Sequence, residues 1–476
     1  MSHFDPKVRS LAPWPLIFVL SAMISACMVG PDYQGPPAVA GSSPDWTRQQ
    51  LGAAASSPPW WRSLQDAQIE QLVALALAHN PDLQASRQRI VQARSQRDAV
   101  AAALLPQVGA QASVQSLQQS ENGPLPLKKL PIIPRYEQIH DAEFDASWDL
   151  DLFGARRRAV QSAQAQQQAE VAAAEDLRKS LVAELVRNVF SLRAQQAQLQ
   201  TLEQALTLAQ QSRRSIARQV AQGELPASAL DDAEQQEKLW AAQLPLLQAS
   251  RQGSVYAIAL LCGQTPQWGL HLLQERQPLP ILPPLPLDAA AAVLARRPDV
   301  RMAERRLAAA TANIGAAKAQ WFPQISIGAA IGYQSLQGSN WFSAASQTSD
   351  LMPLLHWRIF SAGQIQAEVH FAQAQQKEQA YAYAHSVLSA LADVEQHLAA
   401  AQQARLSWDQ EQAAVAAADR SSRHAQHAFA AGEIDLQQRI LSDLQHEQAL
   451  LAEEQSQEQA LNAWVAVNKA LAWPVE

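Results

Sequence analysis

The stretch NPDLQASRQRIVQARSQRDAVAAALLPQV at residues 80–108 returns as RPDVRMAERRLAAATANIGAAKAQWFPQI at residues 297–325. Pro81 corresponds to Pro298 in this repeat, with an offset of 217 residues. Self-similarity over such a length indicates a chain built from two copies of one structural unit.

The correspondence continues beyond this stretch. Trp148 matches Trp357 and Gly223 matches Gly432, both with an offset of 209 residues. The change of offset falls in the segment before Trp148, which is therefore the variable part of the repeat. Each half is expected to have the same order: a helix, a two-strand segment, a very long helical region, a glycine-marked turn and a long helix.

The variable segment shows the period-two alternation of β-strands. From 143 to 152, apolar residues alternate with mostly acidic ones over ten residues, and 107–116 and 324–334 also alternate. A fourth strand is predicted at about 351–360, although Pro353 blurs its pattern. Ten residues is the length of a strand that crosses a bilayer in a tilted barrel. Four strands of a soluble sandwich are the alternative interpretation.

Four strands are too few to close a membrane barrel, because about eight is the practical minimum. Unpaired strand edges are not tolerated in lipid either. Copies of the chain must therefore pool their strands, and two copies would give eight whereas three would give twelve. This argument predicts association without choosing the number.

Three aspartates, Asp145, Asp149 and Asp151, share one face of the strand predicted at 143–152. Such a carboxylate cluster could do acid–base chemistry, as an enzyme would require. Repetition along one strand face describes a wetted pore wall more simply, so we predict that these residues line a lumen. No GxGxxG, Walker A or GxSxG string occurs in the chain. We expect no catalytic residues, no metal site and no cofactor beyond a covalent lipid.

Most of the remaining sequence has the pattern of a coiled coil. Leucines recur every seven residues at Leu185, Leu192, Leu199 and Leu206. The region of about 65 residues before Gly223 would reach about 100 Å as one helix. Gly223 and Gly432 can adopt the left-handed conformation that a reversal needs, so both turns are expected at the far tip.

The N-terminus has the pattern of a lipoprotein signal peptide. A short basic region and an apolar run end at ISAC, residues 24–27. We predict that residues 1–26 are removed and that Cys27 carries the lipid, with an ordinary secretory signal as the alternative. Met28 stands where an aspartate would retain a bacterial lipoprotein in the inner membrane, which favours the outer membrane. Cys262 is then expected to be a small buried residue.

The composition of the chain disfavours some classes of protein. The chain is 48% hydrophobic but only 6% aromatic, and its net charge is −7. A nucleic-acid binder would carry a basic surplus, so that class of protein is disfavoured. No eighteen consecutive residues are apolar, and we therefore expect any membrane crossing to use strands.

Five strings of the sequence resemble the outer membrane factors of tripartite efflux pumps, a TolC-like family, and in particular its OprM-like (NodT-type) lipoproteins. They are CMVGPDYQGP (27–36), WWRSLQDAQIEQLVALALAHNPDL (60–83), FDASWDLDLFGARRRAVQSAQA (144–165), RRPDVRMAERRLAAATANIGAAKAQWFPQISI (296–327) and FAAGEIDL (429–436). Together they span nearly the whole mature chain.

The resemblance implies a mixed α and transmembrane-β fold. In it a homotrimer forms a twelve-stranded barrel, a long coiled-coil α-helical barrel in the periplasm and a small equatorial domain. The implied partners are outer-membrane lipid, a periplasmic adaptor (membrane fusion) protein and an inner-membrane transporter, usually a proton-driven one of RND type. The implied function is a passive exit duct in the bacterial outer membrane, extending into the periplasm. A lipid-anchored coiled-coil scaffold without a pore is the alternative, but it leaves the alternating strands without a purpose.

The tip departs from the family pattern at one position. Family members often carry an aspartate about nine residues after the second tip glycine, and Leu441 stands there in this chain. The aperture is therefore expected to use other charges. Its predicted residues are Gly223, Asp231, Gly432, Asp435 and Arg439.

These features predict the organisation of the whole chain. The expected segments are a signal peptide (1–26), a lipidated N-terminus with an equatorial segment (27–65), a first repeat (66–277) with a hairpin at about 105–153, a proline-rich linker (278–290), a second repeat (291–463) with a hairpin at about 322–360, and a C-terminal equatorial segment (464–476).

Overall fold

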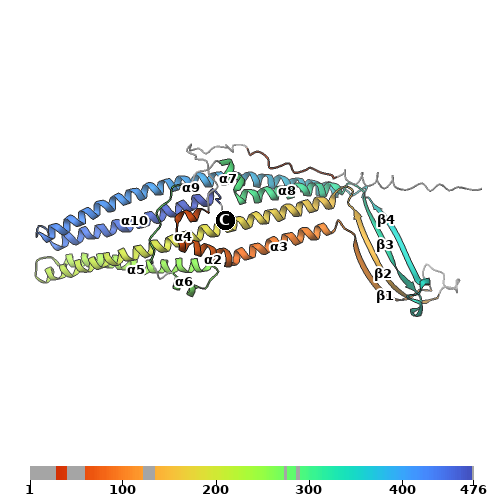
Figure 1. Ribbon diagram of the computed structural model, residues 1–476, viewed down its shortest axis with the longest axis horizontal. Helices are drawn as coiled ribbons and strands as arrows, with labels where there is room; N and C mark the ends of the chain where they lie inside the picture. Colours follow the sequence, from red (N-terminus) through yellow and green to blue (C-terminus); the bar gives the residue numbers. More distant parts are fainter. Residues whose placement is uncertain (1–27, 40–58, 122–133, 273–275, 286–289, 474–476) are drawn as a thin grey trace, which may run out of the picture. The chain divides into compact units, whose positions relative to one another are not determined.

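The computed structural model describes residues 28–39, 59–121, 134–272, 276–285 and 290–473. The predicted signal peptide and Cys27 lie outside the described residues. Figure 1 shows the helices and strands.

Contacts divide the chain into two compact units, and each combines segments from both halves of the repeat. The first unit comprises Met1–Pro37, Ile90–Ala169 and Ala303–Ala382; the second comprises Ala38–Arg89, Glu170–Met302 and Tyr383–Glu476.

The longer helices occur in matched pairs. Helices α3 (Pro81–Ala102) and α8 (Pro298–Ala319) have 22 residues each. Both begin at the repeated proline, whose fixed φ suits the first helical position and whose missing N–H is not needed there. Helices α4 (Ala155–Ala221) and α9 (Gln364–Ala430) have 67 residues each and are rich in alanine and glutamine.

The returning helices are matched as well. Helices α5 (Ala227–Leu261) and α10 (Leu436–Ala470) have 35 residues each. Equal lengths in all three pairs confirm the duplication predicted from the sequence. The shorter helical elements are η1 (Trp60–Leu64), α2 (Ala67–His79), α6 (Pro266–Leu272), α7 (Ala290–Arg296), η3 (Gly338–Asn340) and η4 (Ala344–Ser346).

The first unit contains one four-stranded sheet in the order β1-β2-β3-β4, with all neighbours antiparallel (Figure 1). The strands are β1 (Gln107–Gln118), β2 (Tyr136–Leu150), β3 (Gln324–Ser335) and β4 (Gln347–His356). Within the described part of the chain, β1 and β4 each pair along one side only. The sheet therefore has two open edges.

The fourth strand lies about four residues earlier than the sequence predicted. It ends at His356, and Trp357 donates its indole N–H to the carbonyl oxygen of Trp321 at 3.1 Å. The chain then turns through Ala362 and Gly363, both with positive φ. Because apolar residues follow His356, the sequence prediction extended the strand into this turn.

The two faces of the sheet differ in chemistry. Register places Ala110, Phe144 and Ile331 in one row across β1, β2 and β3. Apolar side chains on this face are largely exposed, as shown by Val108 at 72% and Phe144 at 62%. Among the described residues, the apolar face of the sheet is thus left largely uncovered.

The second unit is held by a tryptophan-rich core. Trp60 of η1 lies edge-on to Trp464 of α10, with ring centroids 5.5 Å apart, and Phe190 of α4 is fully buried in the same cluster. The indole N–H of Trp464 donates to the carbonyl oxygen of Pro284 at 3.2 Å. The proline-rich linker is therefore packed onto the core.

Arg193 of α4 is the polar centre of this packing, with a side chain only 3% exposed. Its guanidinium pairs with the carboxylate of Asp66 and donates to Gln68 at 2.9 Å and Gln277 at 2.8 Å. Burial opposes ionisation of Asp66, but hydrogen bonds from Arg193 and the Ile69 amide lower its pKa. Arg193 also donates to the Pro278 carbonyl at 3.4 Å, so one buried cation joins α2, α4 and the start of the linker.

No helix in the described residues is both long and apolar enough to cross a membrane.

Candidate functional site

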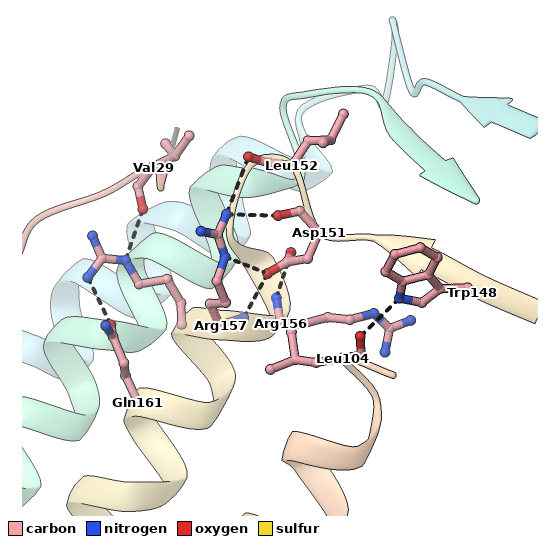
Figure 2. Close-up of polar contacts among 9 residues, drawn as sticks. Val29, Leu104, Trp148, Asp151, Leu152, Arg156, Arg157 and Gln161 are labelled. Carbon is pink, nitrogen blue, oxygen red and sulfur yellow. Dashed lines mark hydrogen bonds and ion pairs between the residues drawn. The ribbon is translucent and has the colours of Figure 1, made fainter. Parts of the chain in front are cut away.

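The passage from β2 to α4 takes only four residues and is organised by Asp151 (Figure 2). One oxygen of its carboxylate accepts from the Arg156 amide at 3.0 Å, and the other accepts from the Arg157 amide at 2.9 Å. Free amides at the start of a helix need such an acceptor, and a negative charge there is stabilised by the helix dipole. Asp151 therefore sets where α4 begins.

The three arginines after this turn all have partners within the first unit. Arg156 pairs with Asp149, and Arg157 donates to the Asp151 carbonyl at 2.8 Å. Arg158 donates to the carbonyl of Val29 at 3.2 Å (Figure 2). The arginines thus fix the strand-to-helix turn.

A second contact at the junction is duplicated. Trp148, near the end of β2, donates its indole N–H to the carbonyl of Leu104 at 2.9 Å (Figure 2). Trp357 after β4 makes the equivalent bond to Trp321 at 3.1 Å. In both halves, an exposed tryptophan joins the end of the second strand to the carbonyl end of the preceding helix. Amphipathic tryptophans of this kind are typical of membrane–water interfaces.

The three predicted lumen aspartates have different surroundings. Asp145 lies on β2 beside Gly109 of β1, and in the described part of the chain it makes no ion pair. Asp149 is on the same strand and is paired with Arg156. Asp151 lies past the strand end and is engaged in capping. A lumen role for the three residues stays a prediction.

Two further acids on the face of Asp145 were missing from the predicted lumen set. Asp141 accepts from Gln334 at 3.0 Å, and Glu143 accepts from Gln111. The predicted strand began at 143, whereas β2 begins at Tyr136. Continuing the alternation towards the N-terminus would have found Asp141.

The two predicted tip turns have the same backbone structure. Gly223 has φ +77° and Gly432 has φ +75°, in the region that favours glycine. The amide after each glycine reaches back to the last turn of the helix: Glu224 to Gln219 at 2.9 Å, and Glu433 to Ala428 at 2.8 Å. Ser212 donates to Gln437 at 2.7 Å, which joins α4 to α10 about three helical turns before Gly223.

The charged residues predicted at the tip are not all brought together. Asp435 caps α10 by accepting from the Gln438 amide at 2.7 Å. Arg439 lies 3.6 Å from Asp443, with its guanidinium over the ring of Phe429. In the described residues, Asp435 and Arg439 form no ion pair with each other.

The remaining predicted tip residue, Asp231, and the residue at the position of the family's aspartate are both exposed. Asp231 projects from the start of α5. Leu441, the residue that replaces the family's aspartate, is 59% exposed. The aperture assignment stays a prediction.

Acidic residues occupy coiled-coil core positions of α10. Ile440, Glu447 and Glu454 are seven residues apart, and Glu454 accepts from the Thr201 hydroxyl of α4 at 3.0 Å. In the described residues, one carboxylate oxygen of Glu447 and one of Glu454 are buried without a hydrogen-bond donor. Burial raises the pKa of both carboxyls, that of Glu454 to about 7.

The remaining candidate groups are Cys262 and possible metal ligands. Cys262 is fully buried in the second unit, and burial raises the pKa of its thiol to about 12, so its prediction as a small buried residue is confirmed. Within the described residues, no three His, Cys, Asp or Glu side chains are grouped so that they could hold a metal ion.

Comparison with known proteins assigns this architecture. The family model described as "Outer membrane efflux protein" matches residues 72–264 and 290–472, one segment in each half of the repeat. The chain belongs to the outer membrane efflux protein family. Its members are channels, and this chain is an outer-membrane channel component of an efflux system, as predicted.

Individual members of the family also match along most of the chain. The toluene efflux pump outer membrane protein TtgF of Pseudomonas putida is 31% identical over 404 residues, covering 81% of each chain. The probable outer membrane lipoprotein SilC of Salmonella typhimurium is 27% identical over 404 residues, covering 83% of each chain.

The solved structure of the outer-membrane channel OprN has a TM-score of 0.81 and 27% identity, covering 94% of this chain and 99% of that one. The predicted TolC-like fold is confirmed.

The junction of this efflux protein gives a first prediction. Asp151→Ala should lower the free energy of unfolding by about 1–2 kcal/mol, because two helix amides lose their acceptor. Asp149→Ala, which removes only an exposed ion pair, should cost about 0.5 kcal/mol or less. Denaturant unfolding followed by circular dichroism measures both. Equal effects of the two substitutions would contradict the capping role.

The buried acids of α10 give a pH prediction. Because the pKa of Glu454 in the folded protein is raised above its ordinary 4.5, folding favours the protonated form. The stabilisation that protonated Glu454 gives the folded protein is fully present below about pH 4.5. It is lost as the pH rises through about 7. Glu454→Gln should therefore raise the melting temperature at pH 8 and leave it unchanged at pH 4.5.

The control for this experiment is Glu203→Gln, which removes an exposed carboxylate from α4. It should leave the pH dependence of the wild type intact. A Glu454→Gln gain that is the same at pH 4.5 and pH 8 would show that the carboxyl does not titrate in this range.

Proposed function

We propose that three copies of the chain pool their strands into one twelve-stranded barrel and continue as a helical tunnel. The sheet supports this arrangement by its open edges at β1 and β4 and by its exposed apolar face. In lipid, an open strand edge would leave backbone groups without partners, whereas closure satisfies all of them. The resemblance to the family implies three copies rather than two, and membership of the family supports that number.

The polar face of the sheet lines the proposed pore. It carries Asp141, Glu143 and Asp145 on β2, which repeat around the barrel in each copy. A ring of carboxylates favours cations over anions in a narrow aqueous passage. Asp149 and Asp151 continue the acidic row towards the start of α4, where arginines neutralise part of the charge.

Cys27 carries a covalent lipid in the proposed protein, and the apolar strand face meets the outer membrane. The lipobox pattern supports lipidation, and SilC, which matches along 83% of its length, is named a lipoprotein. The chain performs no catalytic step. Toluene is the cargo named for TtgF, but a passive duct needs no cargo pocket, so the cargo here is set by the transporter that supplies it.

The expected domain organisation stays part of this proposal. The residues 27–65, 278–290 and 464–476 form the equatorial region, and the two repeats supply the strands and long helices. A periplasmic adaptor and an inner-membrane transporter, of the proton-driven kind usual in the family, complete the pump. The turns at Gly223 and Gly432 form its periplasmic entrance.

The acidic lumen can be tested in planar-bilayer recordings of the purified protein. Neutralising all three acids with Asp141→Asn, Glu143→Gln and Asp145→Asn should lower the cation-to-anion permeability ratio by about two-fold or more. The charge-preserving Asp145→Glu is the matched control and should keep the ratio. Open channels with unchanged selectivity would place these residues outside the pore and contradict the proposed function.

The entrance can be tested in the same recordings. Arg439→Gln removes the contact with Asp443, and Asp435→Asn removes a charge but keeps a residue that can cap α10. The Arg439–Asp443 pair is only partly buried and its closest atoms are 3.6 Å apart, so a single change at either position should do little. Because threefold symmetry multiplies the loss, the combined variant should raise single-channel conductance.

The control for the entrance is Arg405→Gln, which breaks an exposed pair with Asp409 within α9. It should leave conductance unchanged. If the combined variant also keeps the wild-type conductance while the trimer stays intact, the closure depends on other residues.

A further inference from the structure

The described chain begins at Met28, directly after the proposed lipid attachment site, and its first residues are bound to the junction from the start. The Val29 amide donates to the Phe153 carbonyl at 3.1 Å. Arg158 of α4 donates from Nε to the Val29 carbonyl at 3.2 Å and from a terminal nitrogen to the Gly30 carbonyl at 3.1 Å. We call residues 28–33 the N-terminal strap.

Arg158 is buried by this contact, with a side chain only 3% exposed. One remaining partner is Asp32, at 2.8 Å. The other is the side-chain oxygen of Gln161, at 3.0 Å (Figure 2). A buried guanidinium is costly unless its N–H groups find acceptors, and the strap supplies three of them. The strap therefore depends on Arg158 for its position, and Arg158 depends on the strap for its hydrogen-bond acceptors.

Glycines allow the strap to lie directly on the helix backbone. A Cβ on Gly30, whose φ is +99°, would come within 2.4 Å of the Gly315 Cα of α8. A Cβ on Gly315 would come within 2.7 Å of both the Val29 oxygen and Arg158 Nε. A side chain at either position cannot be accommodated without moving the strap.

The far end of the strap is fixed by Tyr33. Its hydroxyl donates to Glu304 at 3.2 Å, and the guanidinium of Arg305 lies over its ring at 5.7 Å. Both partners belong to α8. The strap is thus held at both ends and in the middle.

An apolar surface lies beside the first strap residues. Phe153, whose carbonyl binds Val29, stacks on Phe322 with ring centroids 4.6 Å apart, and Phe322 is 36% exposed. Met28 lies against Gly154, where a Cβ would come within 2.5 Å of the Met28 Cγ. Met28 and Val29 therefore lie beside the turn that carries this aromatic pair.

We propose that the N-terminal strap, positioned by Arg158, seats the acyl chains carried by Cys27 against the Phe153–Phe322 pair. The inference rests on the proposed lipidation of Cys27. Consecutive Cα atoms are about 3.8 Å apart, so a docked Met28 leaves no slack between the strap and the lipidated residue. The lipid is then a fixed part of the strand–helix junction and not a loose tether.

This seating makes the effect of the lipid depend on the strap. Removing the lipid with Cys27→Ser, exported behind an ordinary secretory signal, should lower the temperature at which the oligomer dissociates. The measurement uses full-length protein in vesicles of phosphatidylethanolamine and phosphatidylglycerol. With Gly315→Ala, which dislodges the strap, the same lipid removal should produce little or no further shift.

Two more variants separate the strap from the aromatic seat. Arg158→Lys keeps the charge but cannot bridge two carbonyls and Asp32, so it should act like Gly315→Ala. Phe322→Ser should also abolish the lipid-dependent shift, yet hydrogen exchange at the Val29 amide should stay slow. Gly253→Ala, a helical glycine with open space around it, is the control and should retain the full shift.

The outcomes are distinct. If labelled fatty acid does not enter the wild type at Cys27, the proposed lipidation fails. If it enters, but the shift caused by Cys27→Ser is as large in Gly315→Ala and Arg158→Lys as in the wild type, the lipid acts as a free tether and the seating proposal is overturned. Loss of the shift in the strap variants with its retention in Phe322→Ser would overturn the aromatic seat.

Discussion

The rest of the structure depends on a sheet that cannot be stable alone. In the described part of the chain, four antiparallel strands present an apolar face that is mostly exposed, and the two edge strands pair on one side only. In water the face would drive aggregation, and in lipid the edges would leave N–H and C=O groups without partners. The proposed closed arrangement of several copies would remove both problems, and association would then be part of the fold itself.

The junctions convert this sheet into a support for long helices. The chain changes from a repeat of two residues to one of 3.6 within residues 151–154, where Asp151 accepts the first amides of α4. Trp148 and Trp357 join each second strand to the preceding helix in the same way. Since this tryptophan contact occurs in both halves, the duplicated unit consists of a helix, a β-hairpin and a pair of long helices.

The sequence predicted this plan well because its signals are local. The repeated prolines mark the starts of α3 and α8, and the tip glycines mark two equivalent turns. Alternation located three strands, but the apolar residues after His356 carried the fourth too far, since a tryptophan contact and a turn occupy them. Asp151 looked like a strand residue because its capping role depends on where the next helix begins.

Other features could not be predicted because they join residues far apart in the chain. Burial raises the pKa of Glu454, which lies beside Thr201 of α4, and a heptad pattern alone does not give this burial. The strap depends on Arg158 meeting residues 128 and 129 positions earlier. No local sequence pattern distinguishes Arg158 from the neighbouring Arg156 and Arg157.

The most direct test of the central claim is disulfide cross-linking between the two open edges. Cysteine pairs, one on β1 and one on β4, are introduced in the Cys262→Ser background and oxidised in outer-membrane vesicles. Closure of three copies predicts that one register gives a covalent ladder ending at three chains, with nothing larger. A ladder ending at two chains, a ladder that continues past three, or cross-links confined to single chains would contradict the account.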